Sequence, residues 1–354
     1  MTITSTEKAK YAVAKIEMTA PYDLLLHRMA GDASDRRYYR VTYGAFGEAK
    51  SVVMMELADP AKQLKSEEVT LYHDESEELP FINIHRFLSD IGAPVPRVLV
   101  NDAEHGVLLL EDLGDTLLLD VVRRGDHEEI RKLYKRALDI LVYLQTSGTE
   151  QLTDRCLARR LTYSTELFLW EFRHFIEYGI EARLGPMPAD EKLAIDDLCR
   201  QWSAHLAGLP TVFVHRDYHC RNLMVADNRL VMIDFQDALQ GPATYDLASL
   251  LRDSYVDLGW DLVDELVEYY LAVREKRTGE KIDRAQFATD LWITAMQRNL
   301  KAAGRFVFIE RVKKKPGYEK DIPRTLSYLN GYKKRAPQLT PLIEKLRLWA
   351  PEIE

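Results

Sequence analysis

One segment of the chain constrains its fold more than any other. Residues 212–238 read VFVHRDYHCRNLMVADNRLVMIDFQDA. Their first three residues belong to a short apolar run, Thr211–Val214, that is typical of a buried strand. Two more apolar runs, Leu223–Val225 and Leu230–Ile233, flank the turn formers Asp227-Asn228. This pattern predicts a β-hairpin, which returns the chain to the loop that follows the first strand.

The polar residues of this segment have the spacing of a phosphoryl-transfer site. Asp217 ends the first strand, Asn222 follows five residues later, and Asp234 comes directly after the hairpin. The order H-x-D-x-x-x-x-N and then I-D-F is the kinase catalytic-loop and metal-binding pattern. We therefore predict Asp217 as the base that receives the hydroxyl proton, with Asn222 and Asp234 as oxygen ligands of Mg²⁺ beside ATP. An ordinary hairpin in which Asp and Asn are capping or turn residues would account for each of these residues singly, but it does not account for their joint spacing.

Composition narrows the class of protein further. The 354 residues carry a net charge of −8, which argues against a general nucleic-acid binder. The N-terminus has no apolar signal region and no apolar run is long enough to span a bilayer, so we expect a cytoplasmic protein without a membrane partner. The three cysteines, Cys156, Cys199 and Cys220, lack the spacing of metal ligands.

The order of the predicted elements indicates an α+β protein with a bilobal, protein-kinase-like fold. A small β-rich N-lobe, residues 1–112, is expected to bind the nucleotide, and a larger helical C-lobe, residues 113–354, to hold the catalytic loop and the acceptor site. The predicted strands outside the hairpin region are Asp23–Ala30, Arg37–Tyr43, Ser51–Leu57, Arg97–Val100 and Val107–Glu111. The predicted helices are Phe81–Ile91, Glu128–Gln145, Leu161–Tyr178, Ala189–Leu206, Trp260–Lys276 and Ala285–Phe308.

With these motifs the chain resembles the aminoglycoside phosphotransferase and choline kinase-like family, over residues from about 31 to 308. The family has HGD where this chain has His215-Arg216-Asp217, and D-[FW]-[EQ] where it has Asp234-Phe235-Gln236. The segment GPATYDLASLL is similar to the D-x-x-x-D-L-A segment that follows. The resemblance implies that Asp246 is a buried carboxylate that braces the catalytic loop, and that His215 supports the loop by packing.

Within that family the chain looks most similar to the bacterial kinases that phosphorylate N-acetylmuramate and N-acetylglucosamine at the anomeric carbon. The stretches GDASDRRYYRV and MQRNLKAAGRF carry this similarity beyond the general kinase pattern. It implies an ATP-dependent amino sugar kinase of cell-wall recycling, with a small-molecule partner. The oligomeric state is left open by the sequence.

The residues that bind the nucleotide are predicted from their positions relative to the expected strands. Ser34, Asp35 and Arg36 occupy the turn between the first two strands, where the family's nucleotide-covering loop lies. Glu111 and Leu113 mark the hinge expected to pair with adenine through backbone groups.

The chain departs from the family at the lysine that holds the α- and β-phosphates. The family places this lysine near the end of the third strand, where this chain has Met54 and Met55. Lys50 lies at the start of that strand, too far from this position, so we expect either that Arg36 or Arg37 substitutes or that nucleotide affinity is modest. Its partner glutamate is not assignable; Glu77 and Glu78 are candidates by position.

For the acceptor we predict contacts from Glu171, Arg252, Asp253 and Arg298, the last as a partner for a substrate carboxylate. Two other hypotheses remain open. In the first hypothesis, a kinase of the same fold acts on an aminoglycoside, a choline-like alcohol or another metabolite. In the other, motivated by the missing lysine, the chain is a nucleotide-binding scaffold without catalysis.

Overall fold

A computed structural model describes residues 3–17, 24–29, 36–44, 49–57 and 78–353 of the chain. The chain divides into two compact units, the first formed by residues 1–70 and 95–115 and the second by residues 71–94 and 116–354. In the described ranges no helix is both long and apolar enough to cross a membrane.

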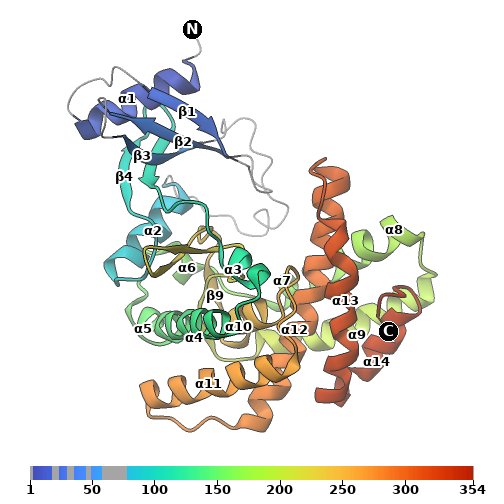
Figure 1. Cartoon of the computed structure of the whole chain (residues 1–354). Helices are drawn as coiled ribbons and strands as arrows, with labels where there is room; N and C mark the ends of the chain where they lie inside the picture. The colour runs from blue at the N-terminus through green and yellow to red at the C-terminus, as the bar shows by residue number, and fades with distance from the viewer. Residues whose placement is uncertain (1–2, 18–23, 30–35, 45–48, 58–77, 354) are drawn as a thin grey trace. The chain divides into compact units, whose positions relative to one another are not determined.

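The first unit is built on a five-stranded antiparallel sheet with the strand order β1-β2-β3-β5-β4 (Figure 1). Residues that face each other across the ladder, such as Tyr39 and Met54 or Val41 and Val52, share one face. Their alternation with more exposed neighbours is the period-2 pattern of a half-buried sheet. The strands are β1 (Leu24–Arg28), β2 (Arg37–Tyr43), β3 (Lys50–Glu56), β4 (Val98–Asp102) and β5 (Val107–Glu111).

A helix that the sequence interpretation missed, α1 (Ser5–Glu17), covers this apolar face (Figure 1). Ala9, Ala12 and Val13 lie on the sheet at helical spacing and are fully buried. Two ion pairs fix the helix, because Lys8 Nζ lies 2.9 Å from Glu56 Oε1 and Lys15 Nζ lies 2.8 Å from Asp102 Oδ1. The apolar side of α1 consists of small residues, so its pattern is weak in the sequence.

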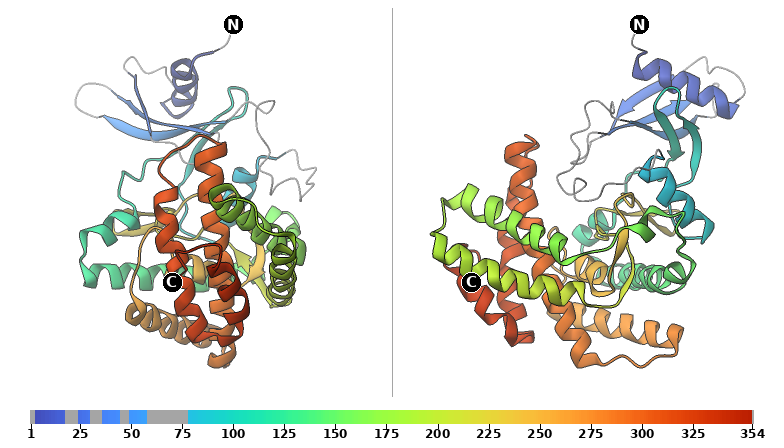
Figure 2. Two further views of the ribbon diagram at one scale, coloured as in Figure 1. Left: turned by 90° about the vertical axis from the view of Figure 1, so that its right-hand side faces the viewer. Right: turned by 180° about the vertical axis from the view of Figure 1, so that it is seen from behind.

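The second unit is mainly helical, and the long helix α12 (Arg284–Val307) packs against α7, α10 and α13 (Figure 2). Its other longer helices are α2 (Pro80–Asp90), α3 (Leu118–Arg124), α4 (His127–Tyr143), α7 (Thr165–His174), α9 (Ala189–Ala207), α10 (Thr244–Leu251), α11 (Trp260–Thr278), α13 (Ile322–Arg335) and α14 (Thr340–Arg347). Short helices are α5 (Thr149–Gln151), α6 (Leu157–Arg160) and α8 (Ala182–Leu184), with π-helical turns η2 (Leu144–Gly148), η3 (Phe175–Glu181) and η4 (Phe308–Val312) and 3₁₀ turns η5 (Glu319–Asp321) and η6 (Pro337–Leu339).

Two small sheets stand among these helices. The strands β7 (Leu223–Ala226) and β8 (Arg229–Met232) form the predicted hairpin, and β6 (Thr211–Val214) pairs with β9 (Leu239–Pro242). Asp227 and Asn228 between β7 and β8 have φ values of +48° and +58°, as a two-residue hairpin turn with two left-handed residues requires. Asp and Asn tolerate this conformation better than most residues, which is why the turn could be predicted.

The α+β prediction is confirmed by this architecture. The predicted strands and helices are observed within a few residues, except that α7 starts at Thr165 rather than Leu161 and passes into η3 beyond His174. The helices α3, α10, α13 and α14 and the strand β9 were not among the predicted elements. The predicted lobe boundary between residues 112 and 113 stays a prediction. The helix α2, which we assigned to the N-lobe, belongs to the second compact unit.

Gly304 permits the close approach of α12 to α7 and η3. A Cβ atom at this position would lie 2.8 Å from the Cα of Phe175 and 3.1 Å from the carbonyl oxygen of His174. Both are backbone atoms, so they cannot turn away as a flexible side chain can. A side chain here would push the two helices apart.

We expect Gly304→Ala to lower the free energy of unfolding by about 1–3 kcal/mol, because overpacking at a backbone contact outweighs the better helix propensity of alanine. Urea-induced unfolding of the variant and the wild type measures this difference. An unchanged or increased stability would contradict the packing described here.

Candidate active site

The loop after β6 carries Asp217, and a buried carboxylate fixes the start of that loop. Asp246 in α10 is fully buried and accepts hydrogen bonds from the backbone N–H groups of His215 (2.7 Å) and Arg216 (2.9 Å). Burial raises the pKa of Asp246 to about 7, while the two N–H donors favour its ionised form. Asp246 thus occupies the bracing position that the family resemblance implies.

Further hydrogen bonds join the loop to the end of the hairpin. The Asn222 side-chain amide donates to the carbonyl of Asp217 (2.9 Å), and the backbone N–H of Ile233 donates to the carbonyl of Asn222 (3.0 Å). His215 Nε2 donates to the carbonyl of Ile233 (3.1 Å). These contacts bring Asp217, Asn222 and the residue before Asp234 together, as the hairpin predicted.

The Asp217 carboxylate has one oxygen held and one open. Arg298 Nη2 donates to Oδ1 at 3.2 Å, whereas no hydrogen bond from the described residues reaches Oδ2. The side chain is 36% exposed, so a hydroxyl can approach it from solvent. The surrounding protein opposes ionisation, but the charges of Lys301 and Arg298 outweigh this and hold the pKa of Asp217 well below its usual range. Asp217 is therefore an oriented anionic acceptor at neutral pH.

Asn222 and Asp234 offer oxygen atoms of the kind that Mg²⁺ prefers. The amide nitrogen of Asn222 is used within the loop, which leaves its Oδ1 without a hydrogen bond from the described residues. Asp234 has a φ of +63°, and its Oδ1 accepts a hydrogen bond from Gln236 Nε2 at 2.8 Å. A non-glycine residue held in this conformation is unusual and is often found at functional sites.

Two of the four predicted acceptor residues lie close to Asp217. Arg298 contacts it directly, and Glu171, which has no exposed surface, lies 3.5 Å from Nη2 of Arg216, the residue before Asp217, and 2.9 Å from Lys301 Nζ. Sequence interpretation did not identify Tyr163 or Gln297, which also reach Glu171. No sequence signal separates these two residues from ordinary core residues of a helical protein.

The other two predicted acceptor residues make structural contacts. Arg252 is 2% exposed, and its guanidinium carbon lies 3.6 Å from the ring centre of Tyr328 and 4.2 Å from that of Trp260. Asp253 Oδ2 accepts a hydrogen bond from the backbone N–H of Cys220 at 2.9 Å, within the catalytic loop. Their contact with an acceptor stays a prediction.

Of the predicted nucleotide-binding residues, Ser34 and Asp35 lie outside the described residues. Arg36 directly precedes β2. Glu111 ends β5, and its Oε2 accepts from the backbone N–H of Arg97 at 3.2 Å, while Leu113 follows two residues later, half-buried. The nucleotide contacts of all five residues stay predictions.

Two of the candidates for the missing lysine have partners of their own, because Lys50 Nζ lies 2.8 Å from Glu17 and Arg37 Nε lies 3.5 Å from Glu56. Arg36, the third candidate, has a buried Nη1 with no hydrogen-bond partner among the described residues. Glu78 contacts Arg86, and Glu77 lies outside the described residues. Met54 and Met55 are fully buried in β3.

Sequence interpretation overlooked Arg40, a cation on the sheet face opposite α1. Its Nε and Nη2 donate to the two carboxylate oxygens of Asp112 at 2.8 and 3.0 Å, and Nη1 lies 2.9 Å from Asp115. Burial opposes ionisation of Asp112, but the Arg40 guanidinium holds the pKa of this carboxyl below its usual range. Arg40 thereby fixes the segment that follows β5 and contains Leu113.

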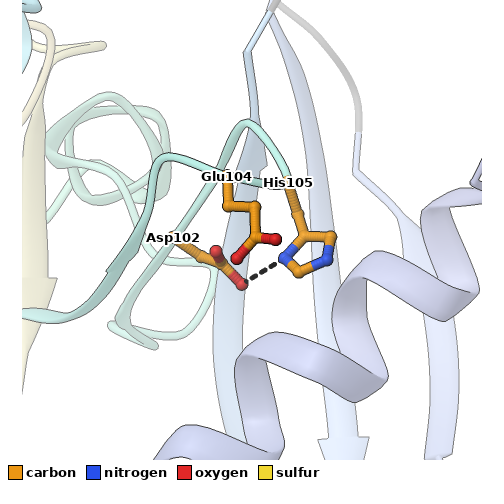
Figure 3. Close-up of side chains that lie close together, drawn as sticks. All are labelled: Asp102, Glu104 and His105. Atoms are coloured by element: carbon orange, nitrogen blue, oxygen red, sulfur yellow. Dashed lines mark hydrogen bonds and ion pairs between the residues drawn. The ribbon is translucent and has the colours of Figure 1, made fainter.

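A second cluster with metal-ligand chemistry lies in the first unit, at the turn between β4 and β5 (Figure 3). Asp102, Glu104 and His105 converge there, with His105 Nδ1 2.8 Å from Asp102 Oδ2. The other Asp102 oxygen is occupied by the ammonium of Lys15, and the His105 ring stacks on Tyr11 with centroids 4.6 Å apart. These contacts identify the cluster as an attachment point of α1.

The buried side chain of His215 leads to a prediction about how stability depends on pH. Burial lowers its pKa from 6.5 to about 4, so the unfolded chain binds a proton more readily than the folded one between these values. The wild type therefore loses stability as pH falls through this window. We expect this loss to exceed that of His215→Gln by about 3 kcal/mol, measured by urea unfolding between pH 7 and pH 4. The opposite effect of Asp246 is common to both proteins and cancels; parallel curves would contradict the prediction.

Comparison with known proteins agrees with this geometry. Residues 26–284 match the model of the phosphotransferase enzyme family. An N-acetylmuramate/N-acetylglucosamine kinase of Pseudomonas aeruginosa is 32% identical over 325 residues, which cover 90% of this chain and 86% of that protein. A protein of the same name from Neisseria meningitidis serogroup B is 32% identical over 317 residues, 88% of this chain and 87% of its own length.

Solved structures show the same fold at low identity. A choline/ethanolamine kinase family protein from Mesorhizobium loti superposes with a TM-score of 0.58 at 14% identity, over 98% of this chain and 100% of its own. The aminoglycoside phosphotransferase APH(2'')-Ib, bound to ADP, gives a TM-score of 0.56 at 15% identity, over 94% and 100%. The family resemblance of the sequence is thus confirmed: the chain belongs to the phosphotransferase enzyme family and is an ATP-dependent small-molecule kinase.

Proposed function

We propose that the chain transfers the γ-phosphoryl group of ATP, with Mg²⁺, to the anomeric hydroxyl of N-acetylmuramate or N-acetylglucosamine. The observation that supports this acceptor is the relationship to the kinases of Pseudomonas aeruginosa and Neisseria meningitidis, both named for these two sugars. Each match covers more than four-fifths of both chains, so it includes the residues around Asp217 as well as the nucleotide side.

The chemistry assigned to the chain's own residues follows from the site. Asp217 accepts the hydrogen of the acceptor hydroxyl on its open Oδ2, while Arg298 keeps the other oxygen in place. Asn222 and Asp234 hold Mg²⁺, which neutralises charge on the phosphates when bound. Because the transition state of phosphoryl transfer is loose, orienting the hydroxyl matters more than a high basicity, and the lowered pKa of Asp217 is compatible with this role.

The fold by itself permits other acceptors. Its structural relatives include a choline/ethanolamine kinase family protein and an aminoglycoside phosphotransferase, each at 15% identity or less. The cationic surroundings of Asp217, with Arg298 in direct contact, favour an acceptor that bears a carboxylate over one with several ammonium groups. A non-catalytic scaffold has no need for an oriented, open carboxylate at this position.

The proposal has a cellular context. A kinase of free amino sugars suits the cytoplasm, where ATP is available and cell-wall fragments are reused. Its partner is then a small molecule, with neither nucleic acid nor membrane involved.

An ATP-consumption screen with N-acetylmuramate, N-acetylglucosamine, choline and kanamycin tests the proposal. We expect the two amino sugars to give the highest turnover, and Asp217→Asn to reduce kcat about 10²–10⁴-fold. Asp237→Asn, an exposed carboxylate of the same segment, is the matched control and should retain activity. Best turnover with choline or kanamycin would refute the amino sugar assignment, and full activity of Asp217→Asn would refute the role of Asp217.

The metal assignment makes a separate prediction. Asp234→Asn should raise the Mg²⁺ concentration required for half-maximal activity about 10–100-fold, because it removes a charged ligand. Activity measured over a Mg²⁺ series at saturating ATP gives this value. If Asp234→Asn and Asp237→Asn have the same Mg²⁺ dependence, Asp234 is not a ligand.

A further inference from the structure

Glu171 in α7 is a buried carboxylate on which side chains from three parts of the second unit converge. Lys301 Nζ lies 2.9 Å from its Oε1, and Gln297 Nε2 donates to its Oε2 at 2.7 Å, both from α12. Tyr163 Oη and Arg216 Nη2 reach Oε1 at 3.4 and 3.5 Å. Glu171 has no exposed surface, and both its oxygens are engaged. Its contacts in the described part of the chain are thus with groups that donate hydrogen bonds or carry positive charge.

One of these partners, Arg216, lies directly before Asp217 in the sequence. Arg216 has a φ of +81°, in the left-handed region, which is sterically unfavourable for a non-glycine residue. Its guanidinium is buried and also donates from Nε to Tyr163 Oη at 3.2 Å. The contacts of the side chain with Glu171 and Tyr163 therefore help to hold a strained backbone position that aims the next residue, Asp217.

Lys301 lies one turn beyond Arg298 on α12. Its contact with Glu171 ties this carboxylate to the helix that also carries Arg298, the residue in direct contact with Asp217. Glu171 thus affects the direction of Asp217 without touching it.

We propose that Glu171 is a positioning residue for Asp217, acting through the Arg216 guanidinium. This role replaces the direct acceptor contact expected from the sequence, and it rests on the proposed function of Asp217 as the base. It also explains why arginine stands where the family has the glycine of HGD. The side chain, fastened to Glu171, maintains a conformation that glycine adopts at no steric cost.

The first test compares Glu171→Gln with Glu177→Gln. Glu177 is an exposed carboxylate further along the same helical segment and serves as the matched control. With N-acetylglucosamine and ATP, or the best acceptor of the screen, we expect Glu171→Gln to lower kcat about 10-fold or more. The KM for ATP should stay within about twofold of the wild type, because Asn222 and Asp234 are unchanged. Equal kcat values for Glu171→Gln and Glu177→Gln would overturn the proposal.

The second test removes the arginine and keeps the backbone conformation accessible. Arg216→Gly suits a φ of +81°, so its loss of kcat measures the missing contact with Glu171 rather than added strain. We expect a loss of several-fold in Arg216→Gly, with the thermal unfolding midpoint recorded alongside. This variant decides the question even if Glu171→Gln does not fold. A kcat equal to that of the wild type would show that the arginine does not position Asp217.

The double variant Glu171→Gln/Arg216→Gly tests whether the two residues act as one unit. If they do, its kcat should be close to that of Glu171→Gln alone, because the shared contact has already been lost. A kcat reduced by the product of the two single effects would show that the residues act independently, which overturns the proposal. If the wild type turns over none of the acceptors, the proposed function itself fails, an outcome distinct from these.

Discussion

The carboxylate of Asp246 accepts hydrogen bonds from the backbone N–H groups of His215 and Arg216, and the arrangement of the candidate active site depends on these two hydrogen bonds. A buried carboxylate is costly unless it is hydrogen-bonded, and here the donors are the two peptide groups that lead into Asp217. The side chain of Asp246, a residue of α10, thereby fixes the backbone of the loop that carries Asp217. The hairpin contacts through Asn222 and Ile233 then position the second half of the site.

Three buried or partly buried carboxylates around this loop differ because their partners differ. Asp246 is paired with backbone dipoles alone, and burial raises its pKa to about 7. Asp217 lies beside Arg298 and Lys301, whose charges keep it ionised. Glu171 is surrounded by donors from three segments and has no exposed surface. Asp246 holds the backbone of the loop, whereas we propose that Asp217 meets the acceptor and that Glu171 positions Asp217. Environment, not residue type, assigns these roles.

The first unit departs from the family pattern while keeping its sheet. Methionines in β3 stand where the family resemblance implies a phosphate-binding lysine, and two cations of the unit have acidic partners: Lys50 pairs with Glu17, and Arg37 with Glu56. Arg40 forms a bidentate pair with Asp112 on the face opposite α1. This pair fixes the segment after β5, for which the sequence predicts a contact with adenine.

Local sequence patterns were sufficient to predict the hairpin, the kinase-like spacing of Asp217, Asn222 and Asp234, most strands and several of the longer helices. These follow from local rules, namely periodicity, turn residues and fixed spacing, which act over a few residues. The sequence did not reveal α1, whose buried side is alanine-rich, or the partners of Glu171. Only the tertiary structure placed Glu171 against Arg216, Gln297 and Lys301, since these contacts join residues up to 130 positions apart in the chain. Long-range pairing of buried charges depends on how helices pack, and no local pattern encodes it.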